Sequence, residues 1–328
     1  MNENEFDSPR RHLRAYILAV SFWLFAMIIA LKTGAVSDAD AALIAEVRLP
    51  RAILATAVGM GLAVSGATLQ ALFSNPLCEP YTLGISSGST LGAVLGMTLG
   101  FRLSMAGLTG SAFAGAMIFT GILYLISLRP GVTGLTLLLA GVMMGFLGSS
   151  LVALWMALAD SAGIQGAVLW LMGDLSRARL SGALFSLADS ILLVGLIWSR
   201  WRSLDALLLG EEAAASLGVP VASVRRRLLL LVSLLIGLCV SGSGMIGFIG
   251  LVVPHFLRRI FGSLHLHLLP LSAIWGATTL TLADALARSI VPPLELPVGV
   301  VTALIGAPLF IFLLTRKARA AVTTEATR

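Results

Sequence analysis

Long apolar runs separated by short polar segments make up most of this chain. Because a helix needs about 20 mainly apolar residues to cross a bilayer, the pattern predicts an all-α polytopic membrane protein. The predicted membrane domain covers 15–315, with polar tails at 1–14 and 316–328. The runs predict about ten transmembrane helices, at 15–31, 52–73, 83–101, 103–128, 133–159, 180–199, 228–240, 245–257, 268–287 and 296–315.

The stretch 228–257 carries no charge and could form one long helix or two short ones. Ser241-Gly242-Ser243-Gly244 interrupts it, and such a Ser/Gly cluster is typical of a turn. We therefore expect two short spans. Another run, 164–173, is too short to cross and should form a surface or re-entrant helix.

The distribution of basic residues indicates which side of the membrane each loop occupies. If the N-terminus is cytoplasmic, most of the 22 Lys and Arg residues fall on the cytoplasmic side, including clusters at 10–14, 225–227 and 316–319. This bias favours cytoplasmic N- and C-termini. A single span over 228–257 would move the last cluster outside, so charge also supports two spans. Only 12% of the residues are charged and the mean hydropathy is +0.97, which excludes a soluble globule.

Sequence motifs for self-contained chemistry are missing. There is no GxxxxGK[ST] phosphate loop and no HExxH motif. Cys78 and Cys239 lack the spacing of a disulfide framework or zinc site. His265 and His267 form an HxH pair without further His or Cys nearby, so we expect no metal site.

Acidic residues within the predicted spans are few, and an intramembrane acid is a functional candidate by default. Asp284 precedes Arg288 by four residues, the spacing at which the two side chains meet on a helix face. We favour a mutually neutralising pair there over an ion-coupling site. Asp189 has no evident local partner and its role is open.

Glycines recur every fourth residue in the third apolar run, from Gly84 to Gly100. On a helix they form a groove that another backbone can approach closely. Plain helix packing is the favoured interpretation, and a sliding or pathway-lining helix is the alternative.

The longest polar segment between runs is 200–227. Within it, 204–217 has the apolar periodicity of a short amphipathic helix, with Glu211 and Glu212 interleaved and Gly218-Val219-Pro220 as a stop signal. Such a helix can lie on lipid or dock in a groove of a partner, and periodicity does not separate the two.

Motifs along nearly the whole chain resemble those of a known family. They are RLPR at 48–51, SGATLQ at 65–70, NPLCEP at 75–80, GEEAAASLGV at 210–219, GFIGLVVPH at 247–255 and ELPVG at 295–299. In this order and spacing they resemble the permease subunit of bacterial ABC importers for iron–siderophores, haem and vitamin B12.

The resemblance implies a ten-helix subunit in the bacterial inner membrane. Its expected partners are two ATPase subunits, a periplasmic substrate-binding protein, and a second permease copy that is identical or a homologue. No cofactor is expected on this subunit, since the ATPase partners use ATP and Mg²⁺. By resemblance, the ATPase-coupling residues are Gly210, Glu211, Ala214, Leu217, Gly218 and Val219.

By the same resemblance, Arg48, Arg51 and Arg288 face the periplasm and dock the binding protein, and the cytoplasmic gate lies near Thr133 and Gly134. The sequence thus predicts a non-enzymatic permease that moves a metal chelate, a ferric siderophore or haem, into the cytoplasm by alternating access. Cobalamin is the alternative cargo. A self-contained ion-coupled transporter is the second class of function, and the scarcity of intramembrane acids argues against it.

Overall fold

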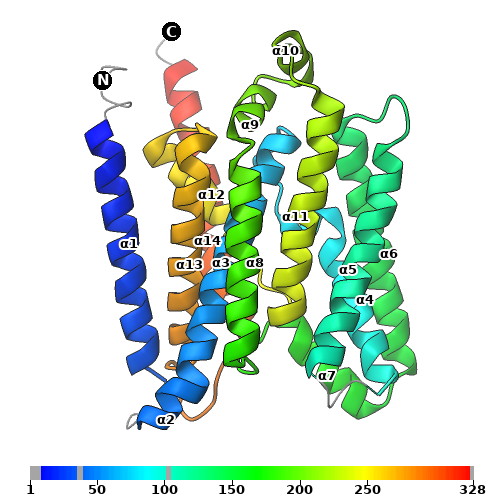
Figure 1. The fold of residues 1–328 in the computed structure, drawn as a ribbon, viewed down its shortest axis with the longest axis vertical. Helices are drawn as coiled ribbons and strands as arrows, with labels where there is room; N and C mark the ends of the chain where they lie inside the picture. Colours follow the sequence, from blue (N-terminus) through cyan, green and yellow to red (C-terminus); the bar gives the residue numbers. More distant parts are fainter. Residues whose placement is uncertain (1–8, 35–39, 101–104, 326–328) are drawn as a thin grey trace.

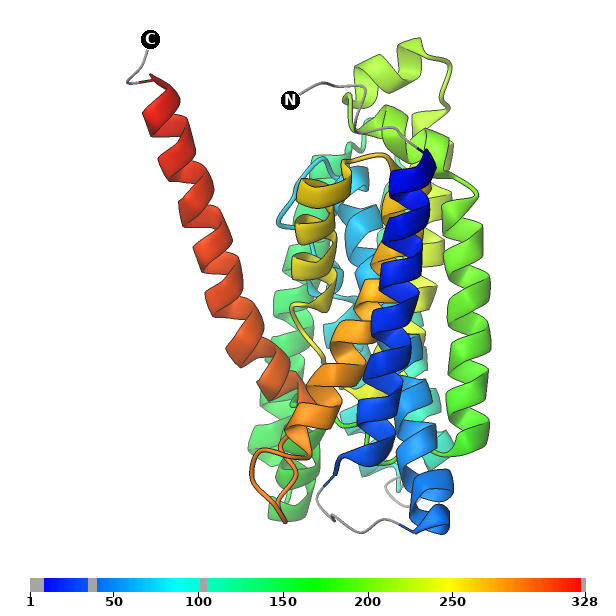
Figure 2. The same ribbon diagram turned by 90° about the vertical axis from the view of Figure 1, so that its left-hand side faces the viewer.

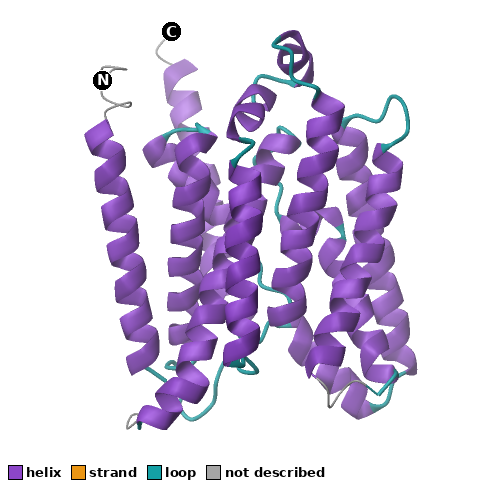
Figure 3. Ribbon diagram, in the orientation of Figure 1, coloured by secondary structure: helices purple, strands orange, loops and turns teal. Residues whose placement is uncertain are grey.

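The computed structural model describes residues 9–34, 40–100 and 105–325, and helices dominate this part of the chain (Figure 3). Each predicted apolar run contains a helix. These helices are α1 (Pro9–Lys32), α3 (Leu49–Leu72), α4 (Ile85–Thr98), α5 (Met105–Ser127), α6 (Gly134–Leu158), α8 (Leu180–Trp198), α11 (Val221–Ser243), α12 (Ile249–Phe261), α13 (His265–Ala287) and α14 (Val298–Glu325). The all-α polytopic fold predicted from the sequence is confirmed.

Helix extends into both predicted polar tails, because α1 begins at Pro9 and α14 continues to Glu325. Arginine, leucine and alanine favour helix, so the helix does not have to end where the apolar run ends. The rest of these tails, 1–8 and 326–328, lies outside the described residues.

Six helical stretches within the described ranges are long and apolar enough to cross a membrane. They are Arg10–Lys32, Ala41–Leu72, Ala106–Ser127, Gly134–Leu158, Leu180–Trp198 and His265–Ala287. By contrast, α4 has 14 residues and α12 has 13, and neither is long enough to cross alone. The prediction that the chain crosses the membrane ten times therefore stays a prediction. The short run near 164–173 forms α7 (Ser161–Leu171), which has 11 residues.

The long helices stand roughly side by side, so the bundle has two ends (Figure 1). One end carries α9 (Trp201–Leu207) and α10 (Glu211–Ser216), and we call it the α10 end. The opposite end carries α2 (Ala41–Leu43) and α7, and we call it the α7 end. The start of α1 and the end of α14 both lie at the α10 end (Figure 1), as an even number of crossings requires. In Figure 2, α14 tilts away from the other helices toward its C-terminal end.

The predicted break within 228–257 is confirmed. Helix α11 ends at Ser243, and Gly244 has φ +68, a left-handed conformation that glycine adopts without a steric penalty. The chain is not helical again until Ile249, which begins α12 in the half of the bundle nearer the α10 end (Figure 2). A non-helical segment at this depth needs protein around it. Gly173 and Trp170 from the neighbourhood of α7 pack closely against Gly244.

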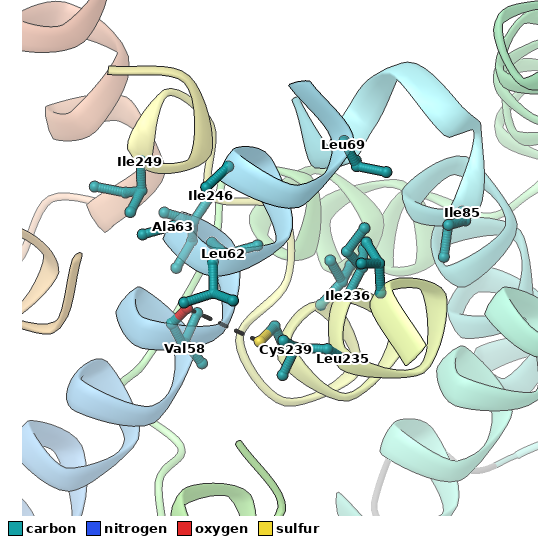
Figure 4. Packing of buried hydrophobic residues seen from close by; sticks show 14 of the residues in the cluster. Val58, Leu62, Ala63, Leu69, Ile85, Leu235, Ile236, Cys239, Ile246 and Ile249 are labelled. Carbon is teal, nitrogen blue, oxygen red and sulfur yellow. Dashed lines mark hydrogen bonds between the residues drawn. The ribbon is translucent and has the colours of Figure 1, made fainter. Parts of the chain in front are cut away.

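Helix α3 forms the centre of the bundle, and nearly all of its residues are buried. Its apolar side chains pack against α11, α12 and α13 in one large core cluster. Figure 4 shows the part of this cluster between α3 and α11. Leu62 and Val58 lie beside Cys239 in this core, and the Cys239 thiol approaches the Val58 carbonyl oxygen at 3.9 Å. Cys78 and Cys239 are both free and buried.

The glycine repeat in α4 serves close helix packing, the interpretation favoured from the sequence. A Cβ at Gly88 or Gly92 would overlap the backbone of α5 at Gly115 and Ser111. Gly84, at φ +69, lies against the backbone of α6 near Gly141. These small residues let α4 approach both neighbours at backbone distance.

Candidate functional site

Within the segment 200–227, α10 projects beyond the starts of α1 and α11, and α9 lies beside the ends of the long helices (Figure 1). The prediction of one helix over 204–217 is wrong in its continuity, because α9 ends at Leu207 and α10 begins at Glu211. Gly210 between them has φ +98, a backbone conformation closed to most residues with a side chain. The two short helices form a protruding loop with a corner at Gly210, and Gly218 closes α10 at φ +82.

The predicted ATPase-coupling residues do not share one exposed face. Ala214 is fully buried and belongs to the core of the chain. Leu217 is 65% exposed, and Ala213 and Ala215 are also exposed. The exposed side of α10 is therefore formed by Leu217 and these two alanines. Ala214 itself packs in the core of this chain and is not exposed to a partner, which corrects its place among the predicted coupling residues.

Two polar contacts fix α9 to the bundle. The Ser74 hydroxyl, just past α3, donates to the Leu207 carbonyl oxygen at 3.4 Å. The Asp205 carboxylate accepts from the His265 backbone N–H at 2.8 Å and contacts the His265 ring Nδ1 at 2.6 Å. This carboxylate satisfies a backbone donor at the start of α13, as the first turn of a helix requires. Helix α9 is thus bonded to the end of α3 and to the start of α13.

A third contact joins α10 to the residues predicted to form the gate. The Gly134 backbone N–H, at the start of α6, donates to Glu211 Oε1 at 3.0 Å. Arg225 forms an ion pair with the same oxygen and donates to the Val132 carbonyl oxygen at 3.0 Å. Thr133 caps α6 by accepting from the Thr136 N–H. The structure therefore brings Glu211 together with Thr133 and Gly134, a juxtaposition that the sequence did not indicate.

The three predicted docking arginines lie near the α7 end but do not project from the surface. Arg48 and Arg51 are each 4% exposed and Arg288 is 2% exposed. Arg48 donates to the carbonyl oxygens of Leu31 and Lys32 at 3.0 and 2.9 Å. Each guanidinium is thus buried and bonded within its own chain, and the docking role of the three arginines stays a prediction.

A carboxylate pair holds two of these arginines together. The predicted Asp284–Arg288 pair is present, with 3.1 Å between Oδ2 and Nε. Sequence reasoning missed that Arg51 Nε also binds Asp284, at 2.8 Å, and that Arg51 Nη1 binds Glu295 at 2.5 Å. Arg288 further donates to the Ala30 carbonyl oxygen at 3.1 Å. This charge cluster joins α1, α3, α13 and the loop before α14.

The other titratable candidates form no site within the described residues. His265 binds Asp205, whereas the His267 ring stacks on His12 with 3.8 Å between centroids, so the two histidines of the HxH pair point to different partners. No group of three potential metal ligands occurs in the part of the chain that the structure describes. Asp189 lies in the wall of a crevice of about 770 Å³ between α5, α8 and α11.

A helical bundle with several membrane-spanning helices and a protruding loop at one end defines a multi-pass membrane protein. Comparison with known proteins identifies the group. The FecCD transport family matches residues 13–316, and the chain belongs to this family. It is thus a permease subunit of the ABC transporter type, in which ATPase activity resides in partner subunits.

Similar proteins cover most of the chain. A vitamin B12 import system permease from Vibrio vulnificus is 41% identical over 289 residues, which is 86% of each chain. A hemin transport system permease from Yersinia pestis is 42% identical and covers 83% of each chain. A solved structure of a metal-chelate type ABC transporter in an inward-facing conformation is 34% identical with a TM-score of 0.84, covering 94% of this chain and all of that one.

Proposed function

We propose that this chain is the permease subunit of an importer that moves a metal chelate from the periplasm to the cytoplasm by alternating access. The cargo is a ferric siderophore or haem, with cobalamin as the alternative. Relatives named for vitamin B12, hemin and Fe(3+) dicitrate support this class, because all three cargoes are metal complexes. The membrane is the bacterial inner membrane, with both termini in the cytoplasm.

The protruding α9–α10 loop is the observation that carries the proposal. It exposes Leu217 beyond the bundle and is bonded to the starts of α6 and α13, so a partner that moves α10 would move long helices. In this proposal the partners at the α10 end are two ATPase subunits, which bind ATP and Mg²⁺ while this chain binds no cofactor. A secondary transporter would not need a loop with this exposed face.

The opposite end docks a periplasmic substrate-binding protein, and a second permease copy, identical or homologous, completes the pathway. Arg48 lies with the charge cluster of Arg51, Arg288, Asp284 and Glu295, so this region holds three arginines and two carboxylates. Their combined electric field acts in docking. Glu295 is the half-exposed member, with 38% of its side chain accessible, and marks where a partner reaches the cluster. Acidic residues on the binding protein would complement the net positive charge of the three arginines and two carboxylates.

Affinity purification of the tagged chain from its native membrane tests this assignment. An ATP-hydrolysing subunit should co-purify with the wild-type chain and be lost from a Leu217→Asp variant that still folds. A Leu209→Asp variant is the matched control, because Leu209 is 66% exposed but precedes α10. Purification of the wild-type chain without any ATPase would contradict the proposal and favour an ion-coupled transporter.

A further inference from the structure

One carboxylate at the α10 end joins three helices. Glu211, the first residue of α10, accepts the Gly134 N–H at 3.0 Å from the start of α6. Its Oε1 also pairs with Arg225 near the start of α11, and Arg225 donates to Val132 at 3.0 Å. The four residues therefore close a ring of polar contacts between α10, α6 and α11.

The first turn of α6 is a favourable place for this carboxylate. The N-terminal N–H groups of a helix have no partner within the helix. The Thr136 N–H donates to the Thr133 hydroxyl, and the Gly134 N–H donates to the Glu211 carboxylate. A carboxylate is favoured at this position because the helix dipole places positive potential there.

Gly134 leaves room for the Glu211 carboxylate, and Arg225 needs it as a negative partner. A Cβ at Gly134 would lie 2.9 Å from Glu211 Oε1, so any side chain there would push the carboxylate away. Arg225 is 5% exposed, and a buried guanidinium needs a negative partner to offset its lost hydration. Glu211 is thus the counter-ion of a buried charge as well as the acceptor at α6.

We propose that Glu211 and Arg225 are positioning residues that carry the movement of α10 to the start of α6, so that α10 and the Thr133–Gly134 region move as one body. The inference rests on the proposed function, since it gives the partner-driven loop a specific helix to move. The experiment below separates this role from two others, in which the contact only stabilises the resting loop or Glu211 leaves it to bind the ATPase.

Spin labels on the two helices distinguish these roles. Cysteines replace Leu135 on α6 and Ser216 on α10, both exposed, in a chain whose buried native cysteines are changed to alanine. The distance between the labels is measured by pulsed EPR in the permease–ATPase complex in nanodiscs, without nucleotide and with ATP and vanadate. The inference predicts one narrow distance distribution in both states.

Variants then test which contact holds the helices together. Glu211→Ala should broaden the distribution and let the distance change with nucleotide, whereas Glu212→Gln, at the exposed neighbouring residue, should leave it narrow. The exchanged pair E211R/R225E restores opposite charges. It should not rescue the narrow distribution, because arginine cannot accept a hydrogen bond from Gly134.

Hydrogen exchange gives an independent measurement on the same complexes. In Glu211→Ala the Gly134 amide should exchange about tenfold faster, a change equivalent to ~1.4 kcal/mol, while Glu212→Gln should not alter it. A wild-type label distance that changes with nucleotide would overturn the inference and indicate that Glu211 releases α6. Equal distributions in Glu211→Ala and wild type would overturn it as well.

Purification and label distances together distinguish failure of the proposed function from failure of this inference. If no ATPase assembles with the wild-type chain, the proposed function fails and the inference falls with it. If the ATPase assembles and hydrolyses ATP but α10 and α6 move apart, only the inference fails.

Discussion

Removing the Asp284 carboxylate should destabilise the chain more than removing any other acid within the described spans. Asp284 is fully buried and lies between Arg51, at 2.8 Å, and Arg288, at 3.1 Å. Asp284→Asn keeps the size of the side chain and removes its charge. The arginines of the cluster would then face Glu295 as their single carboxylate.

The magnitude follows from the partners that remain. Breaking a buried ion pair by removing one member costs about 3–5 kcal/mol. The lower value applies here because Arg51 keeps Glu295 at 2.5 Å and Arg288 keeps the Ala30 carbonyl oxygen at 3.1 Å. A loss of ~3 kcal/mol lowers the Tm by roughly 4–6 °C, because the shift per kcal/mol becomes smaller as the chain becomes longer.

A thiol-reactive fluorescent dye can follow thermal unfolding of the purified chain in detergent. Both native cysteines are buried, and burial raises the pKa of the Cys78 thiol to about 11, so the folded chain should react slowly. Asp189→Asn is the matched control. Asp189 is half-buried in the wall of a crevice and forms no ion pair with the described residues, so its replacement should leave the Tm nearly unchanged.

A Tm of Asp284→Asn within about 2 °C of the wild type, less than ~1 kcal/mol, would refute the reasoning. Equal losses in Asp284→Asn and Asp189→Asn would also refute it, because the effect would then come from any lost intramembrane charge and not from the cluster.

Three further predictions concern the loop, the topology and the packing. Leu217→Asp should leave the Tm unchanged, because Leu217 is 65% exposed, and should abolish ATP-driven uptake in proteoliposomes; normal uptake would remove α10 from the coupling surface. In sealed cells, a cysteine at exposed Ser263 should react only with a cytoplasmic reagent and one at exposed Ser289 only with a periplasmic reagent; reaction of both from one side would contradict the crossing of α13. Gly66→Ala should lower the Tm, because its Cβ would overlap a carbonyl oxygen of α12 at a cost of about 1–3 kcal/mol. Gly110→Ala should not lower the Tm, because a Cβ at Gly110 on α5 would meet open space. Equal Tm values for the two variants would contradict the prediction and indicate that α12 shifts freely.

Local sequence signals predicted the helices well. Hydropathy located the helices because a run of apolar side chains favours lipid whatever the rest of the chain does. The Ser/Gly cluster at 241–244 located the end of α11, where Gly244 has φ +68. The pairing of Asp284 with Arg288 was also predictable, because four residues on one helix fix the distance between the side chains.

Contacts between distant segments were not predictable in the same way. Arg51 and Asp284 are separated by 233 residues, and no local pattern indicates that α3 and α13 bring them together. The same holds for Glu211 and Gly134, which are 77 residues apart. Periodicity predicted one helix over 204–217 because the apolar spacing continues past Gly210, but the backbone angle at that glycine separates α9 from α10.

Uptake into proteoliposomes is the most direct test of the proposed import. The chain is reconstituted with its ATPase, the binding protein is added outside, and cyanocobalamin, haemin and ferric dicitrate are offered in turn. The account predicts that one of these metal complexes accumulates only when ATP is enclosed with the ATPase. Accumulation by the chain alone, driven by a proton or sodium gradient without ATP, would contradict it.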